Sequence, residues 1–217
     1  MIRKIAFIMC LALVVPLAAQ QARPDALRSF RNGRDLDARG RTAEARTAYQ
    51  QAETICRQEL SANPRNIESY VVLGWSLFRL NRYQEAVNIS LEALKINSRE
   101  FRIIENLGEC YFYLGNYPES LRMMERYIDG LPGGERVSTA YFFVGEIFRL
   151  TRRFNHAEIA YSAAVYKEPA VALWWYRLAT VRETVEDKTG AKTAYERALR
   201  LNPSYKEASD GLSRVSS

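Results

Sequence analysis

Three glutamates have the residue type and the spacing that could support chemistry. Glu105 and Glu109 are four positions apart, and Glu146 follows further along the chain, so on helices the first two would share one face. Paired carboxylates can hydrolyse a glycosidic bond, but no pocket motif accompanies these. Because two carboxylates at this spacing repel each other on an isolated helix, we favour an acidic strip that attracts a cationic segment. The alternative is a solvated face whose charge is balanced by Arg102 and Arg149.

The other chemistry-bearing residues are too few for the common catalytic and metal sites. The chain has a single histidine, His156, which leaves little room for a zinc site or for histidine-based acid–base catalysis. We expect His156 in an exposed link between two helices. The glycine-rich segment 130–138 lacks the lysine of a phosphate-binding loop and is predicted to be a turn. The sequence therefore predicts no enzyme activity, no metal and no cofactor.

The composition is that of an ordinary folded protein. Of the 217 residues, 47% are hydrophobic and 26% are charged, with a formal net charge of +6, and these values exclude wholesale disorder. Three cysteines are too few for a disulfide scaffold. Cys56 and Cys110 would pair only if the fold brings their Cβ atoms together, and we favour two buried thiols.

Residues 1–19 have the features of a signal peptide. Arg3 and Lys4 precede an uncharged, mostly apolar run over residues 5–19, which is shorter than the roughly 20 residues that span a bilayer. We predict cleavage after Ala19, with Ala22 as the alternative. The mature chain would then be exported and periplasmic or envelope-associated, while an uncleaved membrane anchor is the competing interpretation.

An internal repeat is the strongest pattern in the sequence. A motif of the form large-x2-Leu-Gly-x2-large, seen as YVVLGWSL at 70–77, recurs with its small residue at Gly74, Gly108, Gly145 and Ala179. These small residues are 34, 37 and 34 positions apart, and each copy continues with small and aromatic residues at matching spacing. The pattern resembles the tetratricopeptide repeat family, whose 34-residue unit carries W-x2-L-G-x2-Y…A-x3-F…P.

The resemblance implies an all-α fold, a right-handed α-solenoid of five helix-turn-helix repeats. A weaker first copy has its small residue at Gly33, which lies seven residues too far from Gly74 for the 34-residue period. An apolar stripe runs through this insertion without Gly or Pro, so the second helix of the first repeat is predicted to be about two turns longer. The predicted units are the signal peptide 1–19, repeats at 26–66, 67–100, 101–137, 138–171 and 172–205, and a capping helix at 206–217.

The resemblance also implies a concave groove, lined by the first helix of each repeat, that binds peptides or protein segments. Its predicted positions carry several aromatic residues, and large apolar groups exposed together indicate a binding surface. Packing between helices is the alternative. The clamp with which chaperone adaptors of this family hold a C-terminal carboxylate is not reproduced. The candidate partner-binding residues are Trp75, Phe78, Glu105, Glu109, Phe112, Tyr113, Phe142, Glu146, Arg149 and Tyr176.

Seven arginines lie between residues 23 and 46, interleaved with four acidic residues. We favour a salt-bridged, solvated face and no nucleic-acid binding, with peripheral envelope or membrane association as the alternative.

The overall expectation is a non-enzymatic scaffold or adaptor of the cell envelope that binds a protein or peptide segment in its groove. The alternative is a regulatory or positioning subunit of an envelope enzyme, transporter or assembly machine that uses its convex face. The oligomeric state stays open.

Overall fold

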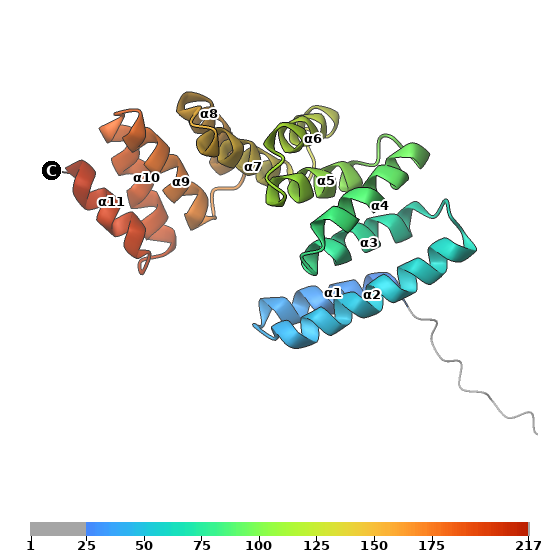
Figure 1. Ribbon diagram of the computed structural model, residues 1–217. Coiled ribbons are helices and arrows are strands. Elements are labelled where there is room, and N and C mark those ends of the chain that lie inside the picture. Colours follow the sequence, from blue (N-terminus) through green and yellow to red (C-terminus); the bar gives the residue numbers. More distant parts are fainter. Residues whose placement is uncertain (1–24, 217) are drawn as a thin grey trace, which may run out of the picture.

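The computed structural model describes residues 25–216, which form eleven helices in sequential antiparallel pairs and no strand (Figure 1). The predicted signal peptide lies outside these residues. The helices are α1 (Ala26–Ala38), α2 (Thr42–Ala62), α3 (Ile67–Arg79), α4 (Tyr83–Ile96), α5 (Phe101–Tyr113), α6 (Tyr117–Gly130), α7 (Val137–Leu150), α8 (Phe154–Lys167), α9 (Ala172–Thr184), α10 (Lys188–Leu201) and α11 (Lys206–Ser216).

Proline ends the second helix of four pairs in the same way. Pro64, Pro132, Pro169 and Pro203 each lie two residues beyond the last residue of α2, α6, α8 and α10. Proline lacks the N–H that a continuing helix needs and pushes the preceding residue out of helical geometry. The next helix therefore starts after a short connection, and the pairs follow one another as a solenoid.

A left-handed residue turns the chain inside every pair. Glycine takes this position at Gly40 and Gly115, with φ of 73° and 75°. In the other repeats Asn81, Arg152 and Glu186 adopt φ of 61–65°. A side chain in this region costs roughly 1–2 kcal/mol, so packing of the two helices, rather than glycine, fixes the turn in those three repeats.

Small residues allow the two helices of a pair to touch. A Cβ built on Gly145 would lie 2.5 Å from the Tyr161 ring, and one on Gly33 would lie 2.5 Å from the Tyr49 ring. Both tyrosine side chains are fully buried. The repeating glycine of the sequence therefore marks the point of closest approach within a pair.

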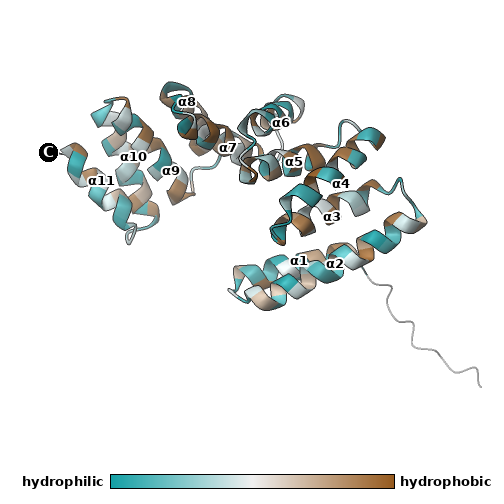
Figure 2. Ribbon diagram, viewed as in Figure 1, coloured by the Kyte–Doolittle hydropathy of each residue, from teal (hydrophilic) through white to brown (hydrophobic). Residues whose placement is uncertain are grey.

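The extra length of the first repeat lies in a helix. α2 has 21 residues, whereas α4, α6, α8 and α10 have 14 each. The difference of seven residues corresponds to about 10 Å of helix. Figure 2 shows α1 and α2 as mostly hydrophilic and α7 as more hydrophobic, as expected for helices at the end and in the middle of a stack.

The odd-numbered helices form the inner layer of the solenoid. Successive odd-numbered helices contact one another from α1 to α7 and from α9 to α11, whereas successive even-numbered helices make no comparable contact. Among the described helices, α7 and α9 break this rule, because they share no contact of that extent. The backbones of α7 and α9 are therefore less closely packed than those of other successive odd-numbered helices. We call this place the opening between α7 and α9, although the rings of Phe142 and Trp174 stack across it.

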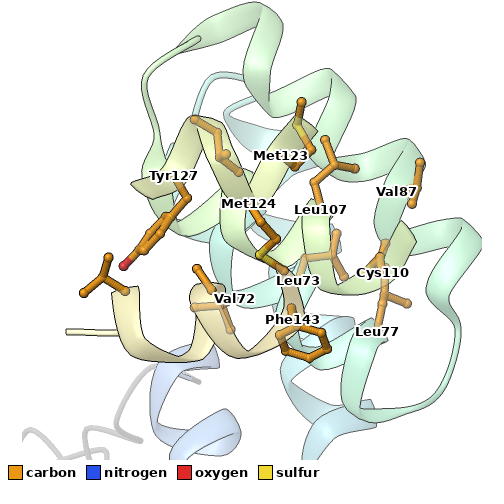
Figure 3. Close-up of a cluster of buried hydrophobic side chains, with 14 of the residues drawn as sticks. Val72, Leu73, Leu77, Val87, Leu107, Cys110, Met123, Met124, Tyr127 and Phe143 are labelled. Carbon is orange, nitrogen blue, oxygen red and sulfur yellow. The ribbon is translucent and has the colours of Figure 1, made fainter. Parts of the chain in front are cut away.

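The hydrophobic core follows the same division. One large cluster runs from α1 to α8, and a second runs from α8 to α11. Figure 3 shows part of the first cluster, where Met123 and Met124 of α6 pack with Leu107 of α5 and Leu73 of α3. Cys110 lies in this cluster and is a free buried thiol, as is Cys56, so the expectation of two buried thiols is confirmed.

Candidate functional site

A series of aromatic rings crosses the inner layer from α3 to α9. Neighbouring ring centroids lie 5.0–6.1 Å apart, mostly in edge-to-face geometry, which stabilises each pair by about 0.5–1.5 kcal/mol. We call these rings the aromatic series. In order they are Trp75, Phe78, Tyr113, Phe112, Phe143, Phe142 and Trp174.

The aromatic series both packs the repeats together and faces outward. Tyr113 is 52% exposed and stacks on Tyr83 with centroids 5.1 Å apart. Trp75 and Phe112 are half-buried. Five candidate residues of the sequence analysis thus lie in one series, joined by two buried rings that the sequence did not single out. Tyr176 is not part of it and instead contacts Tyr195 and Tyr205.

Beside the aromatic series, Glu105 and Glu109 of α5 are buried and bind an arginine of the same chain. Their side chains are each 6% exposed. Arg136, the residue before α7, donates from Nε to Glu105 and from Nη2 to Glu109 Oε1 at 2.6 Å. Its guanidinium carbon also lies 5.5 Å from the centroid of the Trp75 ring, a cation–π distance. The sequence predicts that a bound cationic segment pairs with these glutamates, but Arg136 of the same chain provides that positive charge.

The sequence analysis missed Arg136 because it lies outside the first helices of the repeats. The sequence feature that could have indicated it is the spacing of 37 residues between Gly108 and Gly145, which places three extra residues in the α6–α7 connection. Arg102, considered as a balancing charge for this strip, instead pairs with Glu68 and Glu100 at 2.7 Å. The solvated-face alternative is therefore wrong for Glu105 and Glu109, because both carboxyl groups are buried.

Burial sets the protonation of this pair. It raises the pKa of Glu105 to about 7, because desolvation of the carboxylate outweighs the opposing charge and hydrogen bond of Arg136. Burial also raises the pKa of Glu109, again against the charge of Arg136. A carboxyl group with a pKa near 7 changes its charge close to neutral pH, so this part of the inner face is more negative in alkaline than in acidic solution.

The variant Glu105→Gln is expected to be more stable than the wild type at pH 8, and the two should converge towards pH 5. Between the ordinary pKa of 4.5 and the folded value of about 7, the folded wild type holds a proton that the unfolded chain has lost, so its stability falls as the pH rises. The full difference corresponds to about 3 kcal/mol. Urea unfolding at pH 5, 6, 7 and 8 measures it.

The matched control for that series is Glu146→Gln. Because the pKa of Glu146 is lowered rather than raised, its ionised form stabilises the fold above the ordinary pKa, and this contribution is lost in acid. The control should therefore be less stable than the wild type by an amount that stays constant from pH 8 to pH 5, because the gap closes only below the ordinary pKa of 4.5. A Glu105→Gln difference that stays constant from pH 5 to pH 8 would contradict the assignment.

Glu146 of α7 is a second buried acceptor on the inner face. It accepts the hydroxyl of Tyr161 and a bidentate pair from Arg149, with Nη2 to Oε2 at 2.8 Å. Arg177 of α9 lies 3.0 Å away through its Nε. Burial alone would raise the pKa of Glu146, but the hydrogen bonds from Arg149 and Tyr161 and the nearby arginine charges outweigh it and lower the pKa. The carboxylate therefore stays ionised at neutral pH.

Neither a metal-binding cluster of side chains nor a membrane-spanning helix is found among the described residues. No group of three or more His, Cys, Asp or Glu side chains among residues 25–216 is placed to hold a metal ion. None of the helices in that range is both long and apolar enough to cross a bilayer. His156 is exposed, as expected, but it lies in the first turn of α8 rather than in the link before it, where its ring contacts Phe148 with centroids 5.2 Å apart.

Two family models match the chain. Residues 45–127 match "Anaphase-promoting complex, cyclosome, subunit 3", and residues 175–205 match a tetratricopeptide repeat model. No curated protein sequence matches the chain significantly.

Several solved structures share the fold. MamA residues 41-end from Desulfovibrio magneticus RS-1 is 19% identical, with 85% of this chain and 99% of that chain covered and a TM-score of 0.65. YrrB, described as a TPR protein with an unusual peptide-binding site, is 18% identical, with coverage of 86% and 91% and a TM-score of 0.59. A chain of the APC/C hetero-tetramer Cut9–Hcn1 is 15% identical, with coverage of 88% and 36% and a TM-score of 0.69.

The helices form sequential antiparallel pairs with a period close to 34 residues, and the first helix of each pair lies in the inner layer. These features define an α-solenoid of roughly five repeats plus a cap. Together with the tetratricopeptide repeat model that matches residues 175–205, they identify the fold as a tetratricopeptide repeat solenoid. Members of the tetratricopeptide repeat family typically act without catalysis, as scaffolds that bind peptides or proteins.

Proposed function

We propose that this protein is an interaction scaffold of the cell envelope that holds a segment of a partner protein along its inner face. The observation that carries the proposal is the aromatic series, in which five of the seven rings are half-buried or exposed, and these five lie on α3, α5 and α7. Aromatic side chains supply large contact areas at low entropic cost and dominate the affinity of many interfaces. Buried charges beside them would fix the register of the bound segment.

The groove residues can be tested by crosslinking in intact cells, followed by affinity purification and mass spectrometry. The inner-face variant is Trp75→Ala with Tyr113→Ala. We expect it to lose roughly 90% of the partner crosslinks that the wild type forms, because Tyr113 is the exposed ring of the aromatic series and Trp75 is a half-buried ring at its end, and such anchors dominate interface affinity. Circular dichroism establishes that the variant remains helical.

The matched control replaces two exposed side chains of the outer layer. Ile159 and Tyr166 of α8 are 70% and 87% exposed, so Ile159→Ala with Tyr166→Ala removes similar apolar area from the opposite layer. The control should keep the partner crosslinks. Retention in the inner-face variant together with loss in the control would overturn the groove proposal and favour a positioning subunit that uses its convex face.

The envelope location rests on the sequence alone. The basic start and the uncharged run of residues 5–19 support export with cleavage after Ala19. The intact mass of the protein purified from its native host tests this step, since a mature chain that begins at Gln20 has lost the first 19 residues. A full-length mass would contradict cleavage.

A further inference from the structure

The opening between α7 and α9 forms a cavity on the inner face. Its volume is about 400 Å³, within the range of pockets that hold small ligands or side chains. Its lining residues come from α7, α8 and α9, where the contact between successive odd-numbered helices is interrupted. The polar lining is Arg149, Arg177, Thr180 and Thr184, and the aromatic lining is Phe154 and Tyr176.

This cavity carries an excess of positive charge. Arg149 and Arg177 share a single carboxylate, Glu146, whose lowered pKa keeps it ionised. Two guanidinium groups and one carboxylate leave a formal charge of +1. Glu183 does not correct the balance, because it pairs with Arg214 at 2.9 Å and accepts the Tyr195 hydroxyl.

Donor groups in the cavity also lack acceptors. The buried Nε–H of Arg177 has no hydrogen-bond partner, because it lies 3.0 Å from Glu146 without pointing at that oxygen. Within residues 25–216, the terminal nitrogens of Arg177 make no hydrogen bond either. A buried polar group without a partner is costly, and a guanidinium presents N–H pairs that match the two oxygens of a carboxylate.

The threonine hydroxyl groups of the lining already donate to backbone carbonyl groups. Thr180 donates to the carbonyl of Arg177, and Thr184 donates to the carbonyl of Thr180, both at 2.8 Å. The donors left for a ligand are therefore those of the arginines and the hydroxyl of Tyr176, whose ring lies beside Arg177 at 5.8 Å. A planar oxyanion fits this arrangement, whereas a cation does not.

We propose that this cavity binds the carboxylate of an acidic side chain in the partner segment, with Arg177 and Arg149 as its ligands. The inference rests on the proposed function, since the acidic residue belongs to the segment held along the inner face. The Glu105–Glu109–Arg136 cluster lies at the other end of the aromatic series, so the cavity would fix which end of the segment points towards α9.

The first test needs no partner and uses acetate as the probe. In the full mature chain, labelled with nitrogen-15, the Nε–H signals of the arginines are followed by NMR during titration with acetate, with sodium chloride at equal ionic strength as the reference. We expect the Arg149 and Arg177 signals, assigned through Arg149→Lys and Arg177→Lys, to shift with a saturating, millimolar dependence. Arg46, an exposed residue of α2, should shift no more than in chloride. Equal responses of all three would overturn the proposal.

A second test keeps both arginines and places a competing carboxylate on the lining of the cavity. Thr180→Glu places a carboxylate on the lining one turn after Tyr176, so it should move the Arg177 signal without acetate and weaken acetate binding at least tenfold. Unchanged acetate binding in this variant would contradict the assignment. A parallel titration with inorganic phosphate separates the two sources of an oxyanion, because a site built for a planar carboxylate should prefer acetate, and a preference for phosphate would overturn that choice.

Peptide selection separates the site from the proposed function. Peptides selected from a random 12-residue library by the wild type should share an acidic residue at a fixed position, and Thr180→Glu should abolish that preference while still selecting peptides. Selection without an acidic preference in the wild type overturns the inference and leaves the scaffold function supported. Failure to select any peptide while acetate still binds contradicts the scaffold function and leaves the site supported.

Discussion

Replacing Glu146 with leucine is expected to lower the free energy of unfolding by about 3 kcal/mol. This is the lower end of the cost of removing one partner of a buried ion pair. The carboxylate accepts from Tyr161 and Arg149 and lies beside Arg177. Leucine fills a similar volume but accepts no hydrogen bond, so the Arg149 guanidinium and the Tyr161 hydroxyl lose their acceptor and Arg177 loses its nearby opposite charge. Urea unfolding at pH 7, followed by circular dichroism, measures the change.

A surface ion pair provides the control for this variant. Glu44 pairs with Arg41 across one turn at the start of α2, and both side chains are more than half exposed. Exposed pairs of this kind contribute about 0.2–1 kcal/mol, so Glu44→Leu should change the unfolding free energy by less than 1 kcal/mol. The assignment of Glu146 as a buried hub is wrong if its replacement costs no more than that of Glu44.

Replacing Gly145 with valine is expected to destabilise the fold by about 2–3 kcal/mol through overpacking. A Cβ at this position lies 2.5 Å from Cδ1 of Tyr161, closer than carbon atoms approach one another. The ring has no free space to withdraw into, because it is fully buried and its hydroxyl is held by Glu146. α7 and α8 must therefore separate, which weakens the middle of the stack.

Gly133 is the matched control, since a Cβ there meets nothing within 4 Å. Gly133→Ala should leave the unfolding free energy within about 0.5 kcal/mol of the wild type. Ala179 takes the place of Gly145 in the fifth repeat, so Gly145→Ala should fall between the two variants. A valine that costs no more than the alanine at position 133 would show that the pair is not packed as described.

The fold was predictable because each structural need appears in the sequence at a fixed spacing. The glycines mark the contact within a pair, and the prolines end the second helices. The longer α2 was foreseeable too, since its apolar stripe continues from Ala45 to Leu60 without a break. All of these signals depend on residues that are close together in the chain, so they can be recognised in a single sequence.

The charges of the inner face were less predictable because their partners come from other repeats. Arg136 reaches Glu105 across 31 residues, and the period alone does not place a residue of the connecting segment against an inner helix. Burial of Glu109 depends on how neighbouring repeats stack, which its own helix does not specify. Glu146 was foreseen as a groove residue, but the role of Arg177 depends on the opening between α7 and α9.

The opening between α7 and α9 has a mechanical consequence. Elsewhere in the inner layer, stretching the solenoid must pull apart odd-numbered helices whose backbones are in contact, and the two large hydrophobic clusters meet along α7 and α8. We therefore expect a tensile load applied between α1 and α11 to extend the protein first at this point, where successive inner helices are least closely packed and the Phe142–Trp174 stack and the Glu146–Arg177 ion pair provide the resistance. The solenoid should therefore be most extensible between α7 and α9, and a partner that binds both helices would make it stiffer.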